Sequence, residues 1–241
     1  MIFGDSGNDT IYGNDGPDTI NAGDGNDFVD GGGGNDSILG GAGNDTLNGE
    51  AGNDTLDGQG GDDVLNGGEG DDVIEFMGIG DGDDTITPSD GGDTLVVTGN
   101  SASETFNIAQ SGSSLVVSEG AASVTVMIDG ISGGVEYVVL NAGGGDDTIT
   151  VSSVDQVGFL FLTINGEDGN DTISAAGASL GGVRLLMDGG AGDDTITGSS
   201  DGDTITGGDG DDMISGSDGN DTLRGGLGND LLAGGNGNDL I

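Results

Sequence analysis

Aspartate is the residue type in this chain whose spacing points to chemistry. Between Gly31 and Glu75 an aspartate returns at every ninth position, in units that read GGGGNDSIL, GGAGNDTLN, GEAGNDTLD, GQGGDDVLN and GGEGDDVIE. The repeated aspartates of this stretch are Asp36, Asp45, Asp54, Asp63 and Asp72. A carboxylate is a hard oxygen donor of the kind that Ca²⁺ prefers. An acid at constant spacing therefore predicts a series of calcium sites.

The same unit, in stricter or looser form, recurs outside this stretch. It adds further candidate metal ligands: Asp9, Asp18, Asp27, Asp84, Asp93, Asp147, Asp171, Asp194, Asp203, Asp212, Asp221, Asp230 and Asp239. One unit is defective, because Asp201 occupies the place of a glycine ahead of Asp203. Asp203 is therefore the weakest candidate of the last array. If each ion bridges two turns, about six ions fit the first array and about four the last.

The sequence holds few side chains that could support catalysis or other metal sites. The chain has no histidine, lysine or cysteine, which excludes imidazole catalysis, Ser-Lys nucleophiles and thiolate or histidine zinc sites. Carboxylate pairs could hydrolyse glycosides, but only 3% of the residues are aromatic, too few to line a sugar cleft. We therefore expect no catalysis and no catalytic residues.

Glycine and aliphatic residues must position the aspartates. In each nine-residue unit between Gly31 and Glu75 glycine holds the fourth position, where it permits a turn, and an aliphatic residue holds the eighth, as in a short strand with one inward side chain. Two units make one coil of a flattened solenoid, so equivalent residues of alternate units stack. Asp36, Asp54 and Asp72 then line one edge, and Asp45 and Asp63 line the other.

This pattern resembles the RTX (hemolysin-type) calcium-binding nonapeptide repeat, GGxGxD followed by x, an aliphatic residue and x. The resemblance implies a parallel β-roll in which calcium lies between stacked turns, bound by backbone carbonyls and by the aspartates. It also implies export in an unfolded state by type I secretion, and folding when the chain meets external calcium. We therefore expect an all-β fold: a parallel β-roll or β-helix solenoid with two nonapeptide arrays and a β-rich middle section.

The charge of the chain makes calcium a folding partner as well. The formal net charge is −43, with two basic residues against 45 acidic ones, and 57 residues are glycine. Carboxylates held this close repel one another, and divalent cations relieve the repulsion. The alternative is an acidic disordered chain, which composition alone favours and which we expect without calcium. The acidity also argues against binding to nucleic acid.

Four segments follow from the pattern. Residues 1–96 form an N-terminal roll, 97–140 a β-rich insertion or distorted coils, 141–188 wider coils with stronger apolar strands, and 189–241 a C-terminal roll. The spacing in 97–140 suggests antiparallel hairpins that serve for packing or, less simply, as a ligand-binding module. Residues 76–79 break the phase, as an outward loop or as an apolar plug. No signal peptide or membrane span is visible.

These features favour a structural, non-catalytic, calcium-loaded solenoid from a secreted bacterial protein, located outside the cell or on its surface. It would serve as a surface layer, adhesin stalk or fibre element, and repeats that run to both ends suggest self-association end to end or contact with cell-surface components. The alternatives are an RTX secretion and folding module excised from a larger enzyme or toxin, and a calcium buffer.

Overall fold

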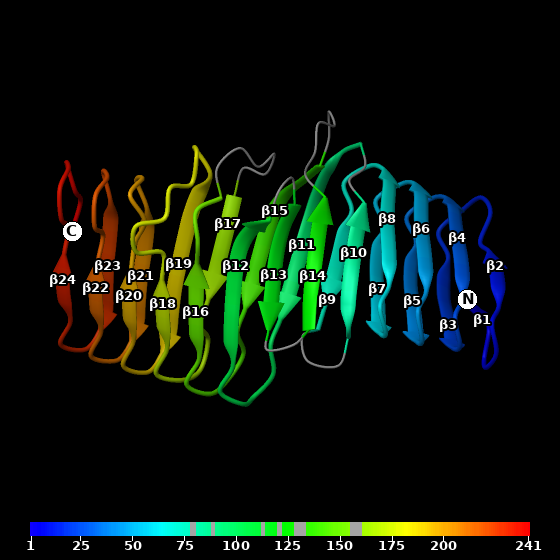
Figure 1. Cartoon of the computed structure of the whole chain (residues 1–241), viewed down its shortest axis with the longest axis horizontal. Coiled ribbons are helices and arrows are strands. Elements are labelled where there is room, and N and C mark those ends of the chain that lie inside the picture. Colours follow the sequence, from blue (N-terminus) through cyan, green and yellow to red (C-terminus); the bar gives the residue numbers. More distant parts are fainter. Residues whose placement is uncertain (78–80, 88–89, 112–113, 120–121, 128–133, 155–160) are drawn as a thin grey trace. The chain divides into compact units, whose positions relative to one another are not determined.

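The computed structural model describes residues 1–77, 81–87, 90–111, 114–119, 122–127, 134–154 and 161–241. Throughout these ranges the regular elements are β-strands (Figure 1). No helix among the described residues is long and apolar enough to cross a membrane. The chain divides into two compact units, Met1–Val97 with Ala121–Val138, and Thr98–Gly120 with Val139–Ile241.

The first unit places alternate strands in two sheets, because each coil contributes one strand to each sheet. The odd-numbered strands are, in spatial order, β1 (Ile2–Phe3), β3 (Thr19–Asp24), β5 (Ser37–Ala42), β7 (Thr55–Gly60), β9 (Val73–Phe76) and β11 (Gly92–Thr98). The other sheet holds β2 (Thr10–Tyr12), β4 (Phe28–Gly33), β6 (Thr46–Ala51), β8 (Val64–Glu69), β10 (Asp83–Thr87) and β14 (Ala122–Met127).

Register in this unit follows the predicted step of two repeat units per coil. Ile38 pairs with Ile20 on one side and with Leu56 on the other, and all the pairs between β1 and β9 in this sheet are parallel. The other sheet pairs Val29 with Leu47 and Leu47 with Leu65 in the same way. These eighth-position side chains are 0–1% exposed, so the aliphatic residue of each unit forms the core.

The phase break lengthens one coil without ending the stack. Leu65 pairs with Ile86 across the break, so β10 continues the sheet in a coil longer than those before it. Phe76 is 2% exposed within β9 and pairs with Val97, whereas Met77 is 58% exposed. The coils continue past the break, so the stack does not end there. The choice between an outward loop and an apolar plug remains a prediction. Residues 78–80 lie outside the described ranges.

The second unit has the same two-sheet plan. One sheet runs from β15 (Gly134–Asn141), of which only Val139–Asn141 belong to this unit, through β17 (Phe161–Asn165), β19 (Arg184–Ala191) and β21 (Thr204–Asp209) to β23 (Thr222–Leu227). The other has the order β13 (Ser114–Glu119), β12 (Thr105–Ser111), β16 (Thr148–Val151), β18 (Thr172–Ser174), β20 (Thr195–Thr197), β22 (Met213–Ser215) and β24 (Leu231–Ala233).

Coil length varies in this unit. Ile149 pairs with Ile173 and Ile173 with Ile196, whereas Ile196 pairs with Ile214 at the shorter step of two repeat units. Strands β12 and β13 pair antiparallel, as a hairpin of the kind predicted there, and β12 also pairs parallel with β16. Strand β14, by contrast, pairs parallel with β10 in the first unit.

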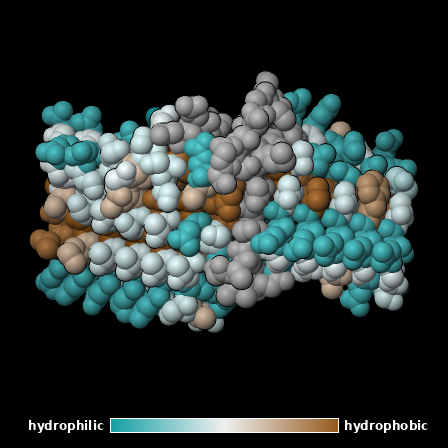
Figure 2. All heavy atoms as spheres, viewed as in Figure 1, coloured by the Kyte–Doolittle hydropathy of each residue, from teal (hydrophilic) through white to brown (hydrophobic). Residues whose placement is uncertain are grey.

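The predicted fold class is confirmed: the described chain is all-β and consists largely of parallel, coil-stacked strands. The division into four segments remains a prediction. Strands carry apolar residues inward, and most of the candidate aspartates lie in the turns between strands. Figure 2 shows the result on one face, where hydrophilic residues gather in rows separated by paler and brown bands.

Candidate calcium sites

Most of the candidate aspartates end a turn and lie directly before a strand, whereas Asp84 and Asp93 lie inside β10 and β11 and Asp239 precedes an isolated bridge at Leu240. The short strand that follows turns its aliphatic side chain into the core, and this fixes the direction of the aspartate before it. Most of these aspartates are buried even though they are acidic; Asp45, Asp54, Asp63 and Asp72 are only 1–2% exposed. A buried carboxylate needs partners, because removal of an ionised group from water costs several kcal/mol.

One carboxylate oxygen finds its partner in the preceding coil. The backbone N–H of Asp27 donates to Asp45 Oδ1 at 2.8 Å, and the N–H of Asp45 donates to Asp63 Oδ1 at 2.7 Å. Repetition of this bond builds four ladders: Asp9–Asp27–Asp45–Asp63–Asp84, Asp18–Asp36–Asp54–Asp72–Asp93, Glu104–Asp147–Asp171–Asp194–Asp212–Asp230 and Asp203–Asp221–Asp239. The two ladders of the first unit correspond to the two predicted edges.

The other oxygen has no hydrogen-bond partner in most ladder members. Within the described residues this holds for the buried Oδ2 atoms of Asp9, Asp27, Asp36, Asp45, Asp54, Asp63, Asp72, Asp147, Asp171, Asp194, Asp212 and Asp221. A buried polar atom without a partner is costly and rare, so a row of them calls for a specific explanation. A cation held beside the row would satisfy every member at once.

Glycine leaves room beside these oxygens. A Cβ atom on Gly31 would lie 2.5 Å from Asp36 Oδ2 and 2.9 Å from the carbonyl oxygen of Gly49, one coil further on. Gly40 repeats the arrangement with Asp45 Oδ2 at 2.5 Å and the Gly58 carbonyl oxygen at 2.6 Å. A carboxylate oxygen and a carbonyl oxygen thus converge on a space that a side chain would fill.

This donor set fits calcium. Ca²⁺ takes six to eight oxygen ligands, and it accepts carboxylates and backbone carbonyls in flexible geometry. No group of three or more acidic, histidine or cysteine side chains in the described part of the chain is arranged to hold a metal. Backbone carbonyls would therefore supply much of the coordination, with the ladder aspartates contributing the charge.

The electrostatics of the ladders agree with a need for positive charge. Burial, opposed by the amide bond to Oδ1 and reinforced by facing carboxylates, raises the pKa of Asp63 and of Asp72 to about 6. The same causes raise the pKa of Asp194 to about 7 and that of Asp84 to about 8. Without a cation, the folded state therefore holds a proton on each of these groups more tightly than an ordinary aspartate does.

We expect the metal-free chain to gain β structure on acidification. The folded-state pKa values of Asp63 and Asp72 lie above the ordinary value of 3.8. The folded state then binds protons more tightly than the unfolded state, so its stability rises as the pH falls through about 6 toward 3.8. Circular dichroism in chelator across this range measures the effect. A flat signal would show that burial of these carboxylates does not oppose folding.

The remaining predicted residues occupy distinct places. Asp84 and Asp93 continue the two ladders of the first unit beyond the phase break. Asp9, Asp18, Asp230 and Asp239 are ladder ends and are only partly buried. Asp203 is buried, but its carboxylate accepts hydrogen bonds from Ser199, so it differs from the aspartates described above.

Glu104 is a ladder member that the aspartate pattern missed. Its N–H donates to Asp147 Oδ1 at 2.6 Å, its side chain is 6% exposed, and its carboxylate accepts the N–H of Asn100. Gly99, Glu104 and the buried Phe106 hold the first, sixth and eighth positions of the unit GNSASETFN. A search that allowed glutamate and an aromatic core residue could have found this unit.

Comparison with known protein families agrees with the geometry. The model of the RTX calcium-binding nonapeptide repeat matches residues 3–38, 39–74, 129–153, 163–178, 188–223 and 206–241. These segments cover most of the chain, including ladder residues of both units. No curated protein shows significant similarity to the chain.

Proposed function

Because the chain belongs to the family of RTX calcium-binding nonapeptide repeats, we propose that it is a non-catalytic structural solenoid of a secreted protein that folds when it binds calcium. One observation carries the proposal: rows of buried aspartates whose Oδ2 atoms have no hydrogen-bond partner among the described residues. The sixth-position carboxylates whose Oδ2 atoms have no hydrogen-bond partner among the described residues are its metal ligands, and the carbonyls of the glycine-rich turns complete the coordination.

Charge supports the coupling of binding to folding. About ten ions, each bridging two turns, contribute about +20 and offset nearly half of the formal charge of −43. Bound calcium supplies positive charge between coils where the ladders concentrate negative charge. The chain's own residues prepare the site: the amide bond to Oδ1 orients each carboxylate, and the aliphatic core residue holds the coil in register.

Extracellular calcium suits such sites. Extracellular calcium modules bind with dissociation constants of about 10⁻⁴ to 10⁻³ M. Sites of this strength remain empty at the low free calcium of a cytosol and fill outside the cell, so the chain would stay unfolded until exported. Repeats of this family are typical of secreted proteins, which supports the same location.

A paired substitution tests the ligand assignment. Asp45→Asn with Asp63→Asn removes two charges from one ladder, and we expect a several-fold higher calcium concentration at the midpoint of folding, measured by circular dichroism. The matched control is Asp62→Asn with Asp71→Asn. These aspartates are exposed and hold the fifth position, where Asn35, Asn44 and Asn53 occur naturally. Equal midpoints for the two double variants would show that the ligands have been assigned wrongly.

The role as a fibre or surface-layer element has its own test. We expect electron microscopy in several millimolar calcium to show filaments that dissolve in chelator. Monomers that persist under these conditions would contradict the fibre role. They would favour the second candidate, a secretion and folding module of a larger type I-secreted enzyme or toxin, which the family match supports as well.

A further inference from the structure

The turn Gly198–Asp203 is built differently from its neighbours. It reads GSSDGD, with Ser199 in the second position and Asp201 in the fourth. The next unit, Gly207–Asp212, has Gly208 and Gly210 there with φ of 121° and 145°, whereas Ser199 and Asp201 do not adopt positive φ. The backbone of this turn therefore has a different conformation from that of the turn Gly207–Asp212.

Ser199 donates hydrogen bonds to Asp203 Oδ2. In most other turns the equivalent oxygen has no partner among the described residues. The Ser199 N–H donates to Asp203 Oδ2 at 2.7 Å, and the Ser199 hydroxyl lies 3.1 Å from Oδ2 and 3.0 Å from Oδ1. That hydroxyl also accepts the N–H of Asp201 at 3.1 Å. Ser199 is 0% exposed, so these bonds form away from water. Asp212 and Asp221, in the next two repeat units, each retain an Oδ2 atom with no partner among the described residues.

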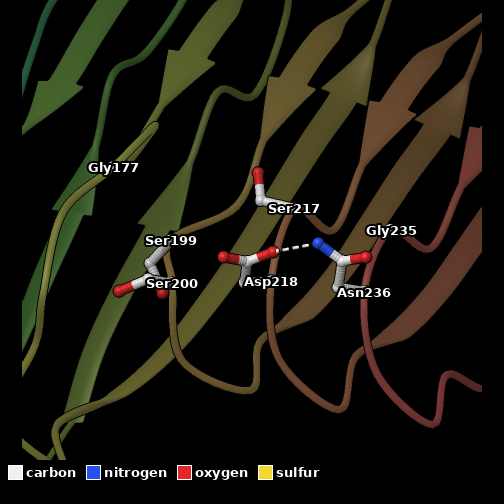
Figure 3. Close-up of a pocket in the computed structure, with 7 residues that line it drawn as sticks. All are labelled: Gly177, Ser199, Ser200, Ser217, Asp218, Gly235 and Asn236. Atoms are coloured by element: carbon white, nitrogen blue, oxygen red, sulfur yellow. Dashed lines mark hydrogen bonds between the residues drawn. The ribbon is translucent and has the colours of Figure 1, made fainter.

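The neighbouring segment is bound to this turn by hydrogen bonds and adds no carboxylate to it. The N–H and hydroxyl of Ser200 donate to the Ala178 carbonyl at 3.0 and 2.8 Å, and the Leu180 N–H donates to Asp201 Oδ2 at 2.8 Å. The segment 176–182 contains no acidic residue, so it offers no carboxylate to a shared ion. Figure 3 shows Ser199 and Ser200 beside Gly177 on one side and beside Ser217 and Asp218 on the other.

We propose that Ser199 replaces calcium at this turn. Resting on the proposed calcium-dependent fold, the inference is that Gly198–Asp203 is a metal-free internal cap. The hydroxyl and the amide of Ser199 provide Asp203 with the hydrogen-bond donors that it would otherwise lack, so Asp203 requires no cation. Asp201 and Ser200 join the turn to the segment 176–182 by hydrogen bonds. The ladder that begins at Asp203 then binds calcium from Asp221 onward, where Oδ2 has no such donor. Asp203, although in ligand register, is not a metal ligand.

Metal counting tests the inference. The full chain is saturated with calcium and separated from free ion, and bound calcium per chain is measured by atomic spectrometry. We expect Asp203→Asn to hold as many ions as the wild type, and Asp221→Asn and Asp212→Asn each to hold at least one fewer. Loss of an ion from Asp203→Asn equal to that from Asp221→Asn would overturn the inference.

A second variant keeps the test decisive if Asp203→Asn fails to fold. Ser199→Ala removes the hydroxyl but leaves the carboxylate, and we expect a lower thermal midpoint in saturating calcium with an unchanged metal count. Loss of an ion from Ser199→Ala, or a thermal midpoint equal to that of the wild type, would overturn the role of Ser199. A wild-type chain that held no calcium would instead overturn the proposed function, so the two failures are distinguishable.

Discussion

Removal of calcium by a chelator is expected to abolish most of the β signal of this chain at neutral pH. At a calcium concentration of about 100 times the dissociation constant, each site stabilises the folded state by about 2.7 kcal/mol. About ten sites then contribute on the order of 27 kcal/mol, more than the roughly 5–15 kcal/mol by which whole domains are stable. Without this contribution, nothing offsets the repulsion between the carboxylates of a chain whose net charge is −43.

The measurement is far-UV circular dichroism during a calcium titration, with magnesium as the control ion. Magnesium demands near-octahedral geometry and releases its water reluctantly. We therefore expect magnesium at equal concentration not to substitute for calcium at sites made largely of backbone carbonyls. Full β signal in chelator at neutral pH would contradict folding by binding. Equal rescue by both ions would show that general charge screening, rather than coordination, drives the transition.

Gly52→Ala is expected to destabilise the first unit by more than about 4 kcal/mol, which is exceptional for one methyl group. Gly52 holds the fourth position of its unit with φ of 145°, a conformation that residues with a Cβ atom rarely adopt. A Cβ atom there would overlap the carbonyl group of Gly34 in the preceding coil, only 2.5 Å from its carbon. Gly34 and Gly52 both lie in backbone whose position the strand pairing and the ladders fix, so neither segment can move without a large cost.

Gly7→Ala is the matched control. Gly7 also holds a fourth position with positive φ, 115°, and precedes an asparagine as Gly52 does, but a Cβ atom there meets no described atom within 4 Å. We expect this variant to show the conformational cost alone, about 1–2 kcal/mol. Thermal midpoints in saturating calcium compare the two. Equal shifts would mean that strain at φ, and not contact between coils, explains the regular spacing of these glycines along the chain.

Much of the fold follows from the sequence because the coil is a local, repeated solution. An aliphatic residue at every ninth position predicts that alternate units stack, and the pairs Ile20–Ile38 and Val29–Leu47 confirm it. The strand pattern around Gln110–Ser113 also predicted the hairpin of β12 and β13. A fixed period restricts each residue to one neighbour in the next coil, so register needs no long-range information.

The sequence by itself thus determined the period, the acidic edges and the need for counter-charge, because these depend only on residue types at fixed spacing. The tertiary structure decided which oxygen of each carboxylate is already bonded and which is not. It placed Glu104 in a ladder through its contact with Asp147, and it showed Ser199 at the carboxylate of Asp203. The first result depends on what the adjacent coil presents, and that changes wherever a coil is longer than two repeat units. The second depends on how a single turn closes when Ser199 and Asp201 do not adopt positive φ.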